Sequence, residues 1–194
     1  FGNVIAVVKS IDNDLIDDIA VGAEEANIGA KKTGLVRALS GNSPSDKIFD
    51  ESGAKKDRMG SAVAPAGDLD FDGRADLIVG SATADDAGLK NAGTVTVLSA
   101  NGQPLLVAAD TEAARQTGAR FGSAVARIGD INDDGIDDYA VGAPHQDTRV
   151  QGQLLVNAGR VVAISGADGS EIWSLDGTRP GMKLGYRLLA GPES

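Results

Sequence analysis

The chain has 194 residues, of which 18 are basic and 28 acidic, giving a net charge of −10, and it has no cysteine. The lack of cysteine excludes disulfide bonds and thiol chemistry. The acidic balance, without a basic stripe carrying interleaved aromatic residues, disfavours nucleic acid as a partner, and no apolar segment is long enough for a membrane span.

The chain begins with a unit of short apolar segments, residues 1–58. An acidic loop at 10–18 separates the first two segments. β-branched and apolar runs that are bounded by Gly, Asn and Asp favour strands. The four predicted strands are the run after Phe1-Gly2, the run that ends at Val21-Gly-Ala, and the runs at 34–40 and 47–50.

The same pattern occurs twice more and then starts again. The second unit covers 59–120 and opens with Met-Gly, the third covers 121–183 and opens with Phe-Gly, and Leu184-Gly begins a fourth that covers 184–194. Repetition of this kind is typical of proteins in which each unit packs on the next. The later strands of the second and third units are predicted at 93–99, 104–108, 159–165 and 171–175.

Two of the repeated loops carry acids at alternate positions. Residues 68–76 read Asp-Leu-Asp-Phe-Asp-Gly-Arg-Ala-Asp, and residues 130–138 read Asp-Ile-Asn-Asp-Asp-Gly-Ile-Asp-Asp. Alternating acids in a tight loop can direct their oxygens to one point, and calcium takes about six to eight oxygen ligands at about 2.3–2.6 Å. We therefore predict a calcium ion in each of these two loops.

The spacing of the acids argues against an EF-hand. An EF-hand loop needs a bidentate Glu at its twelfth position and a helix on each side, whereas the twelfth residues here are Val79 and Val141. The last acid is the ninth residue, and the run after it suits a strand better than a helix. Each loop is therefore predicted to join two strands.

Four short strands in each unit predict an all-β fold made of β-propeller blades with four antiparallel strands. A β-sandwich also has frequent turns, but it gives no reason for the same four-strand pattern to recur. The chain would hold about three blades and the start of a fourth. Because propellers have about four to eight blades, we expect missing sequence or another subunit to supply the remainder.

The start, loop and end of each unit resemble the FG-GAP repeat, which occurs in the amino-terminal propeller of integrin α subunits and in many bacterial surface and secreted proteins. The third unit is the best match, with Phe121-Gly, the loop at 130–138 and Gly142-Ala-Pro144. The second unit has Met59-Gly and Gly80-Ser in the corresponding places. The resemblance implies a calcium-binding propeller in an exported protein.

The predicted ligands follow from positions within the loop. Side chains at the first, third, fifth and ninth positions would bind the metal together with the main-chain carbonyl at the seventh. The alternative is that Asp, Asn and Gly are present because they form good turns. The predicted ligands are Asp68, Asp70, Asp72, Arg74 and Asp76 in one loop, and Asp130, Asn132, Asp134, Ile136 and Asp138 in the other.

The first loop departs from this pattern. Ser10 replaces the first carboxylate and Leu15 replaces the Gly. A Leu side chain disfavours the left-handed backbone that this Gly usually adopts. We expect the degenerate site, formed by Ser10, Asp12, Asp14 and Asp18, to bind calcium weakly or to be empty.

Other candidate residues have plainer interpretations. His145 is the sole histidine and has no nucleophile context for a catalytic triad, so we interpret it as an exposed loop residue. The tripeptide Arg74-Ala-Asp76 has Ala where an integrin-binding tripeptide needs Gly. Trp173 and Phe49 are predicted to pack between blades.

Strand order predicts where a partner binds. In an up-and-down blade the first and third turns lie at one end of the strands, and the second turn and the link to the next blade lie at the other. The calcium loops occupy the first end, and connections of variable length occupy the second. We predict a protein or carbohydrate ligand on the face opposite the calcium loops, contacted by the longest connection through His145, Gln146, Asp147, Arg149 and Gln151.

The sequence thus predicts a non-catalytic, calcium-stabilised module for binding, adhesion or structural assembly in a secreted or cell-surface protein. Cytosolic calcium is too scarce to fill ordinary extracellular-type sites of about 10⁻⁴–10⁻³ M. Two alternatives stay open. One is an accessory or catalytic propeller of a secreted carbohydrate- or phospholipid-processing enzyme, and the other is a polymer in which blade faces stack.

Overall fold

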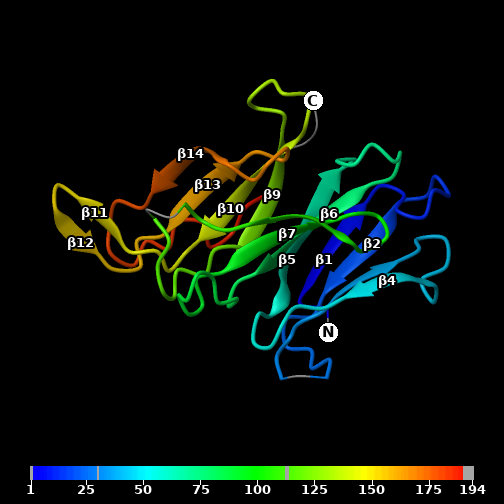
Figure 1. Cartoon of the computed structure of the whole chain (residues 1–194), viewed down its shortest axis with the longest axis horizontal. Coiled ribbons are helices and arrows are strands. Elements are labelled where there is room, and N and C mark those ends of the chain that lie inside the picture. Colours follow the sequence, from blue (N-terminus) through cyan, green and yellow to red (C-terminus); the bar gives the residue numbers. More distant parts are fainter. Residues whose placement is uncertain (1, 30, 112–113, 190–194) are drawn as a thin grey trace.

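Three antiparallel sheets of four strands each form the body of the protein. The computed structural model describes residues 2–29, 31–111 and 114–189. Within these residues it contains strands and no helix, which confirms the predicted all-β fold. Figure 1 shows the sheets following one another along the long axis of the molecule.

Each sheet is an up-and-down meander in which neighbouring strands run antiparallel. The first sheet has the order β1-β2-β3-β4 and the second the order β5-β6-β7-β8, while the third has the order β9-β10-β13-β14. The strands are β1 Val4–Val8, β2 Asp18–Gly22, β3 Val36–Leu39, β4 Lys47–Glu51, β5 Met59–Gly67, β6 Asp76–Ser81, β7 Thr94–Leu98, β8 Pro104–Ala108, β9 Ala124–Gly129, β10 Asp138–Ala143, β13 Arg160–Ile164 and β14 Glu171–Asp176. Every predicted strand in these three units is present.

A small hairpin was not predicted. Strands β11 (Thr148–Val150) and β12 (Gln153–Leu155) pair within the connection between β10 and β13. The hairpin projects from one end of the molecule in Figure 1. Its alternating burial is weak, because two residues of each strand are exposed, so the pattern of apolar residues gives little signal for it.

Two apolar cores hold the three sheets together. The first and second sheets share a core that includes Val36, Phe49 and Leu77, and the second and third share one that includes Ile78 and Tyr139. Consecutive residues of β6 thus face different cores, as the two-residue period of a strand requires. The second sheet is therefore buried on both faces, and all six residues of β6 are buried.

Glycine pairs bring the sheets into backbone contact. We call the Gly in the second position of a unit the head glycine, and the Gly near the end of its second strand the tail glycine. A Cβ on tail Gly22 would lie 2.3 Å from the carbonyl oxygen of head Gly60, and one on Gly80 would lie 1.9 Å from that of Gly122. The head and tail of the repeated motif are thus the two sides of one contact between successive units.

The two aromatic residues of the outer strands differ in burial. Phe49 is buried and meets Gly102 of the second sheet, as predicted for a residue between blades. Trp173 pairs with Ala163 as Phe49 pairs with Ala38, but it is 43% exposed. Among the described residues no four-stranded sheet follows the third one, so packing of Trp173 between blades stays a prediction.

The turns between strands lie at two opposite ends of the sheets. The acidic loops and the turns after β3, β7 and β13 share one end, because the strands alternate in direction. The connections between β2 and β3, between β6 and β7, and between successive sheets share the other. Of the predicted fourth unit, residues 190–194 lie outside the described residues, and Leu184 forms an isolated parallel bridge with Gly159.

Candidate metal sites

The three acidic loops fold in the same way. In each loop the backbone amide at the fifth position donates to the side chains at the first and third positions. For the third loop, the Asp134 amide donates to Asp130 Oδ1 at 3.1 Å and to Asn132 Oδ1 at 3.0 Å. For the second, the Asp72 amide donates to Asp68 at 3.0 Å and to Asp70 at 3.2 Å. Oxygen atoms from alternate positions are thereby gathered around the loop.

The ninth residue of each loop is a fully buried aspartate that joins two turns. Asp76 Oδ2 accepts from the Leu69 amide at 2.7 Å, and its Oδ1 accepts from the Ala100 amide at 3.0 Å. Leu69 belongs to the acidic loop, and Ala100 belongs to the turn after β7. The equivalent bonds of Asp18 end at Ile11 and Gly41, and those of Asp138 end at Ile131 and Gly166.

Carboxylates converge closely in the first and second loops. Oxygen atoms of Asp68, Asp70 and Asp76 lie within 4.8 Å of one another, and so do those of Asp12, Asp14 and Asp18. Burial raises the pKa of Asp76 to about 6, and the charges of Asp70 and Asp72 add to this effect. Crowded oxygen ligands around a buried carboxylate whose ionised form is disfavoured match the requirements of a hard divalent cation.

Asp72 has a different partner from the other acids of its loop. Its carboxylate accepts hydrogen bonds from the guanidinium of Arg74, and this contact lowers the pKa of Asp72. The structure thus brings together three of the four predicted side-chain ligands, with Asp72 held by Arg74. The side chain of Arg74 was not part of the prediction, which assigned only its carbonyl.

The third loop uses an amide in place of one acid. Asn132 accepts from the Asp134 amide through Oδ1 and donates through Nδ2 to Asp134 Oδ2 at 2.8 Å. Asp130 Oδ2 accepts from the Gly135 amide at 2.8 Å. Three of the predicted side-chain ligands, Asp130, Asn132 and Asp134, are therefore connected through the Asp134 amide, whereas Asp138 accepts from the Ile131 and Gly166 amides.

The first loop keeps its shape despite its altered sequence. Ser10 Oγ accepts from the Asp14 amide at 2.9 Å, so the hydroxyl takes the place of the first carboxylate. Leu15 has φ 68°, close to the values of 84° and 85° at Gly73 and Gly135. The side chain of Leu15 is 91% exposed. The unfavourable residue is tolerated in the left-handed conformation rather than altering the loop.

The candidate recognition residues are only partly at the surface. Arg149 and Gln151 are exposed, in and beside the small hairpin. Gln146 is 5% exposed, and its Nε2 donates to the carbonyl of Ala114 at 2.6 Å. The inclusion of Gln146 in a recognition surface was therefore wrong, because its side chain is used inside the fold.

The hydrogen bond that joins each acidic loop to the third turn of its sheet was not predicted from the sequence. The signal for it is a small residue after a buried serine, at Ser40-Gly, Ser99-Ala and Ser165-Gly. A Cβ on Gly41 would lie 1.9 Å from the Asp17 carbonyl, and one on Gly166 would lie 2.0 Å from that of Asp137. The two turns therefore approach each other closely.

These repeated loops and paired glycines define a class of protein. The FG-GAP repeat family model matches residues 59–98. This match and the integrin α relatives described below support an FG-GAP, integrin-like propeller family for the chain. The head and tail glycines and the acidic loop between them are the parts of the structure that carry the repeated motif.

Integrin α subunits are among the relatives. The chain is 30% identical to integrin alpha-4 of Xenopus laevis over 162 residues, which is 81% of this chain and 15% of that protein. It is 36% identical to integrin alpha-IIb of Mus musculus over 117 residues, which is 55% of this chain and 11% of that protein. The chain thus spans a small part of the length of these relatives.

Solved structures show the same fold at low sequence identity. A rhamnogalacturonan lyase from Bacillus licheniformis superimposes with a TM-score of 0.51 at 15% identity, over 91% of this chain and 35% of the lyase. At this identity the likeness concerns the fold alone. In the part of the chain that the structure describes, no helix has the length and apolar character needed to cross a membrane.

Proposed function

We propose that the chain is a non-catalytic, calcium-stabilised propeller module that serves binding, adhesion or structural assembly in a secreted or cell-surface protein. The observation that carries the proposal is the convergence of Asp68, Asp70 and Asp76 within 4.8 Å, in a loop whose fold recurs in the other two units. The match of residues 59–98 to the FG-GAP repeat supports the same function.

Calcium would be held by the side chains and main-chain carbonyls predicted above. In the second loop these are Asp68, Asp70, Asp72, Asp76 and the carbonyl of Arg74, and in the third they are Asp130, Asn132, Asp134, Asp138 and the carbonyl of Ile136. The ion supplies positive charge that offsets the repulsion among the acids. Asp72 would exchange its contact with Arg74 for the metal, because both need the same carboxylate.

Calcium would act on stability rather than on a reaction. Asp76 and Asp138 connect the acidic loop to the turn after the third strand, so a cation that fixes the loop also fixes that turn. A ligand that binds only the folded state stabilises it by RT ln(1 + [L]/Kd). This effect is largest where calcium is abundant, as it is outside the cell.

The units are proposed to be blades, at 1–58, 59–120 and 121–183, with a further blade starting at 184. The uncovered face of the first sheet, where Ile5 and Val7 are 64% and 65% exposed, supports completion of the ring by additional blades. A ligand would be a protein or a carbohydrate bound at the end opposite the acidic loops.

Thermal unfolding with and without calcium tests the proposal. We expect a chelator to lower the melting temperature of the wild-type protein, and the double variant Asp70→Ala with Asp134→Ala to lose most of this response. At a calcium concentration of about 100 times Kd the stabilisation would be about 2.7 kcal/mol per site. A melting temperature that is the same in millimolar calcium and in chelator would contradict the proposal.

The alternative of an accessory or catalytic propeller in a carbohydrate-processing enzyme is tested by a separate observation. Such an enzyme needs paired carboxylates, separate from the metal loops, beside a substrate. Turnover of an acidic polysaccharide by the purified chain would support this alternative. The unfolding experiment does not depend on its outcome.

A further inference from the structure

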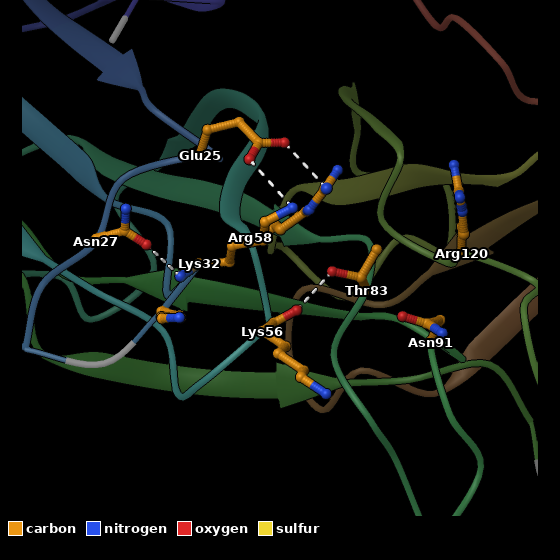
Figure 2. Close-up of a pocket in the computed structure, with 9 residues that line it drawn as sticks. Glu25, Asn27, Lys32, Lys56, Arg58, Thr83, Asn91 and Arg120 are labelled. Atoms are coloured by element: carbon orange, nitrogen blue, oxygen red, sulfur yellow. Dashed lines mark hydrogen bonds and ion pairs between the residues drawn. The ribbon is translucent and has the colours of Figure 1, made fainter.

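Basic side chains gather in a cavity at the end opposite the acidic loops. The cavity has a volume of about 590 Å³, and of the nine residues that line it five are basic and one, Glu25, is acidic. The lining residues come from four connections: β2 to β3, β4 to β5, β6 to β7 and β8 to β9. Figure 2 shows how they surround the cavity. The basic ones are Lys31, Lys32, Lys56, Arg58 and Arg120.

A carboxylate of the protein itself already forms ion pairs in this cavity. Glu25 pairs with Arg58 at 3.0 Å and with Lys32 at 3.8 Å, and its side chain is 57% exposed. Figure 2 shows both contacts on one side of the residues drawn, with Arg120 on the opposite side. Among the described residues, Lys31, Lys56 and Arg120 have no ion-pair partner within 4.0 Å. The cavity therefore has more positive charge than Glu25 can neutralise.

The two arginines occupy the same place in successive units. Arg58 and Arg120 each precede the opening residue of a unit, and Lys183 does so in the third case. All three have left-handed backbones, with φ 54°, 60° and 53°. Their amides donate to the carbonyls of Lys32, Asn91 and Asn157 in the preceding connection. A basic residue is thus fixed in a constrained backbone at each step between units.

Further charged groups lie near the basic residues of the cavity. Desolvation lowers the pKa of His145, and the charges of Arg120 and Lys183 lower it further, so these two cations lie close enough to act on one group. Two nearby acids, Asp57 and Asp85, accept from the backbone amides of Ala54 and Asn91, each at 2.9 Å. The cavity thus concentrates basic side chains in a chain whose net charge is −10.

We propose that this cavity binds a carboxylate-rich segment of a protein partner, with Arg58 and Arg120 as the main contacts and Glu25 as an internal competitor. The inference rests on the proposed binding function and specifies the chemistry of its ligand. Guanidinium groups bind carboxylates through paired hydrogen bonds. The nine lining residues include no aromatic side chain, which sugar and base stacking would favour.

Binding of a labelled oligoglutamate peptide, measured by fluorescence polarisation at low ionic strength, tests this assignment. We expect Glu25→Gln to tighten binding, because it removes the carboxylate that the ligand must displace. We expect the double variant Arg58→Gln with Arg120→Gln to weaken binding about tenfold or more, from the loss of charge-assisted hydrogen bonds. Added salt should weaken binding to the wild type.

A matched control separates the cavity from the overall charge. The double variant Lys9→Gln with Lys47→Gln removes the same charge at the acidic-loop end and should leave binding unchanged. An equal loss in both double variants would overturn the proposal, as would no change in affinity with Glu25→Gln. Preferential binding of an oligogalacturonate of matched charge would also overturn it, in favour of an acidic polysaccharide.

The calcium response of the same variants keeps the two proposals distinct. Glu25, Arg58 and Arg120 lie at the end away from the acidic loops, so their substitution should leave the calcium-dependent shift in melting temperature intact. A protein that responds to calcium but does not bind oligoglutamate contradicts the cavity assignment alone. A protein with no calcium response contradicts the proposed function.

Discussion

Each acidic loop ends in an aspartate whose two oxygens serve different turns. Asp18, Asp76 and Asp138 are all fully buried. In the first loop, Asp18 accepts from the Ile11 amide at 2.6 Å and from the Gly41 amide at 2.9 Å. Buried amides that lose such partners cost about 1–3 kcal/mol each. This residue therefore has a structural role that does not require a metal.

Substitution of Asp18 tests that role. We expect Asp18→Ala to lower the free energy of unfolding by about 2–4 kcal/mol, because the buried Ile11 amide and the partly buried Gly41 amide lose their acceptors. Urea denaturation in the presence of a chelator measures this effect without a contribution from calcium. Asp17→Ala is the matched control, because Asp17 is exposed and the second unit has Ala75 at the same position. Equal losses in the two variants would refute the structural role.

Leu15 offers a test of backbone strain in the degenerate loop. It has φ 68°, and its side chain is 91% exposed, so its packing contributes little. A left-handed backbone costs a non-glycine residue about 1–2 kcal/mol. Leu15→Gly should therefore raise the free energy of unfolding by about 0.5–1 kcal/mol after the entropy cost of Gly.

Ile16→Gly is the control for the Leu15 experiment, because Ile16 does not have a positive φ. It should lower stability, and chemical denaturation of both variants gives the comparison. If Leu15→Gly lowers stability as much as Ile16→Gly does, strain at Leu15 is not released by Gly. A calcium titration of Leu15→Gly would also show whether this residue weakens the first site.

At the scale of elements, contact between sheets depends on glycine. The tail glycines lie in β2, β6 and β10, and each one faces the head glycine of the following unit. The approach is so close that a Cβ on Gly142 would lie 2.0 Å from the carbonyl of Gly185. Gly is therefore required here by backbone proximity, which explains why the head and tail of the motif occur together.

Substitution of Gly80 tests this explanation. Gly80→Ala places a methyl group 1.9 Å from the carbonyl oxygen of Gly122, and this backbone atom cannot move without shifting the third sheet. We expect a loss of about 3 kcal/mol or more in the free energy of unfolding. Gly88→Ala is the control, because Gly88 has φ +84° and no atom within 4 Å of its Cβ position.

The control Gly88→Ala should cost only about 1–2 kcal/mol, from strain alone. Differential scanning calorimetry on both variants distinguishes the two causes. A loss at Gly80 no larger than the loss at Gly88 would mean that the second and third sheets separate easily, against the account of paired glycines.

The strands were predictable because they have a strong local signal. Runs such as Thr94–Leu98 and Arg160–Ile164 are apolar and β-branched, and turn residues bound them. The hairpin of β11 and β12 was not predictable, because most of its residues are exposed and its pairing is short. The alternation of apolar and polar residues indicates which side chains are buried, and this hairpin buries few side chains.

The candidate metal loops were recognisable from acids at alternate positions, but their connections were not. The bond from Asp76 to the Ala100 amide joins residues 24 positions apart, and no local pattern encodes it. The contact of Arg74 with Asp72 is local, yet the sequence alone does not distinguish a bound guanidinium from an exposed one. The basic cavity also draws on residues from several connections, which only the fold brings together.

At the scale of the whole molecule, the two ends of the sheets differ in charge. The acidic loops lie at one end, and the basic cavity around Arg58 and Arg120 lies at the other. The second sheet has a neighbour on each face, whereas β1 of the first sheet exposes Ile5 and Val7. Calcium at one end would stiffen the sheets that present the cavity at the other.

The proposed function depends on calcium binding in the second and third acidic loops. Isothermal titration calorimetry of the calcium-free protein tests it most directly, with the variants Asp70→Ala and Asp134→Ala beside the wild type. We expect about two strong sites in the wild type, given the oxygen ligands that calcium requires, and the loss of one site in each variant. A wild-type protein that binds no calcium at millimolar concentration, or variants that keep both sites, would contradict it.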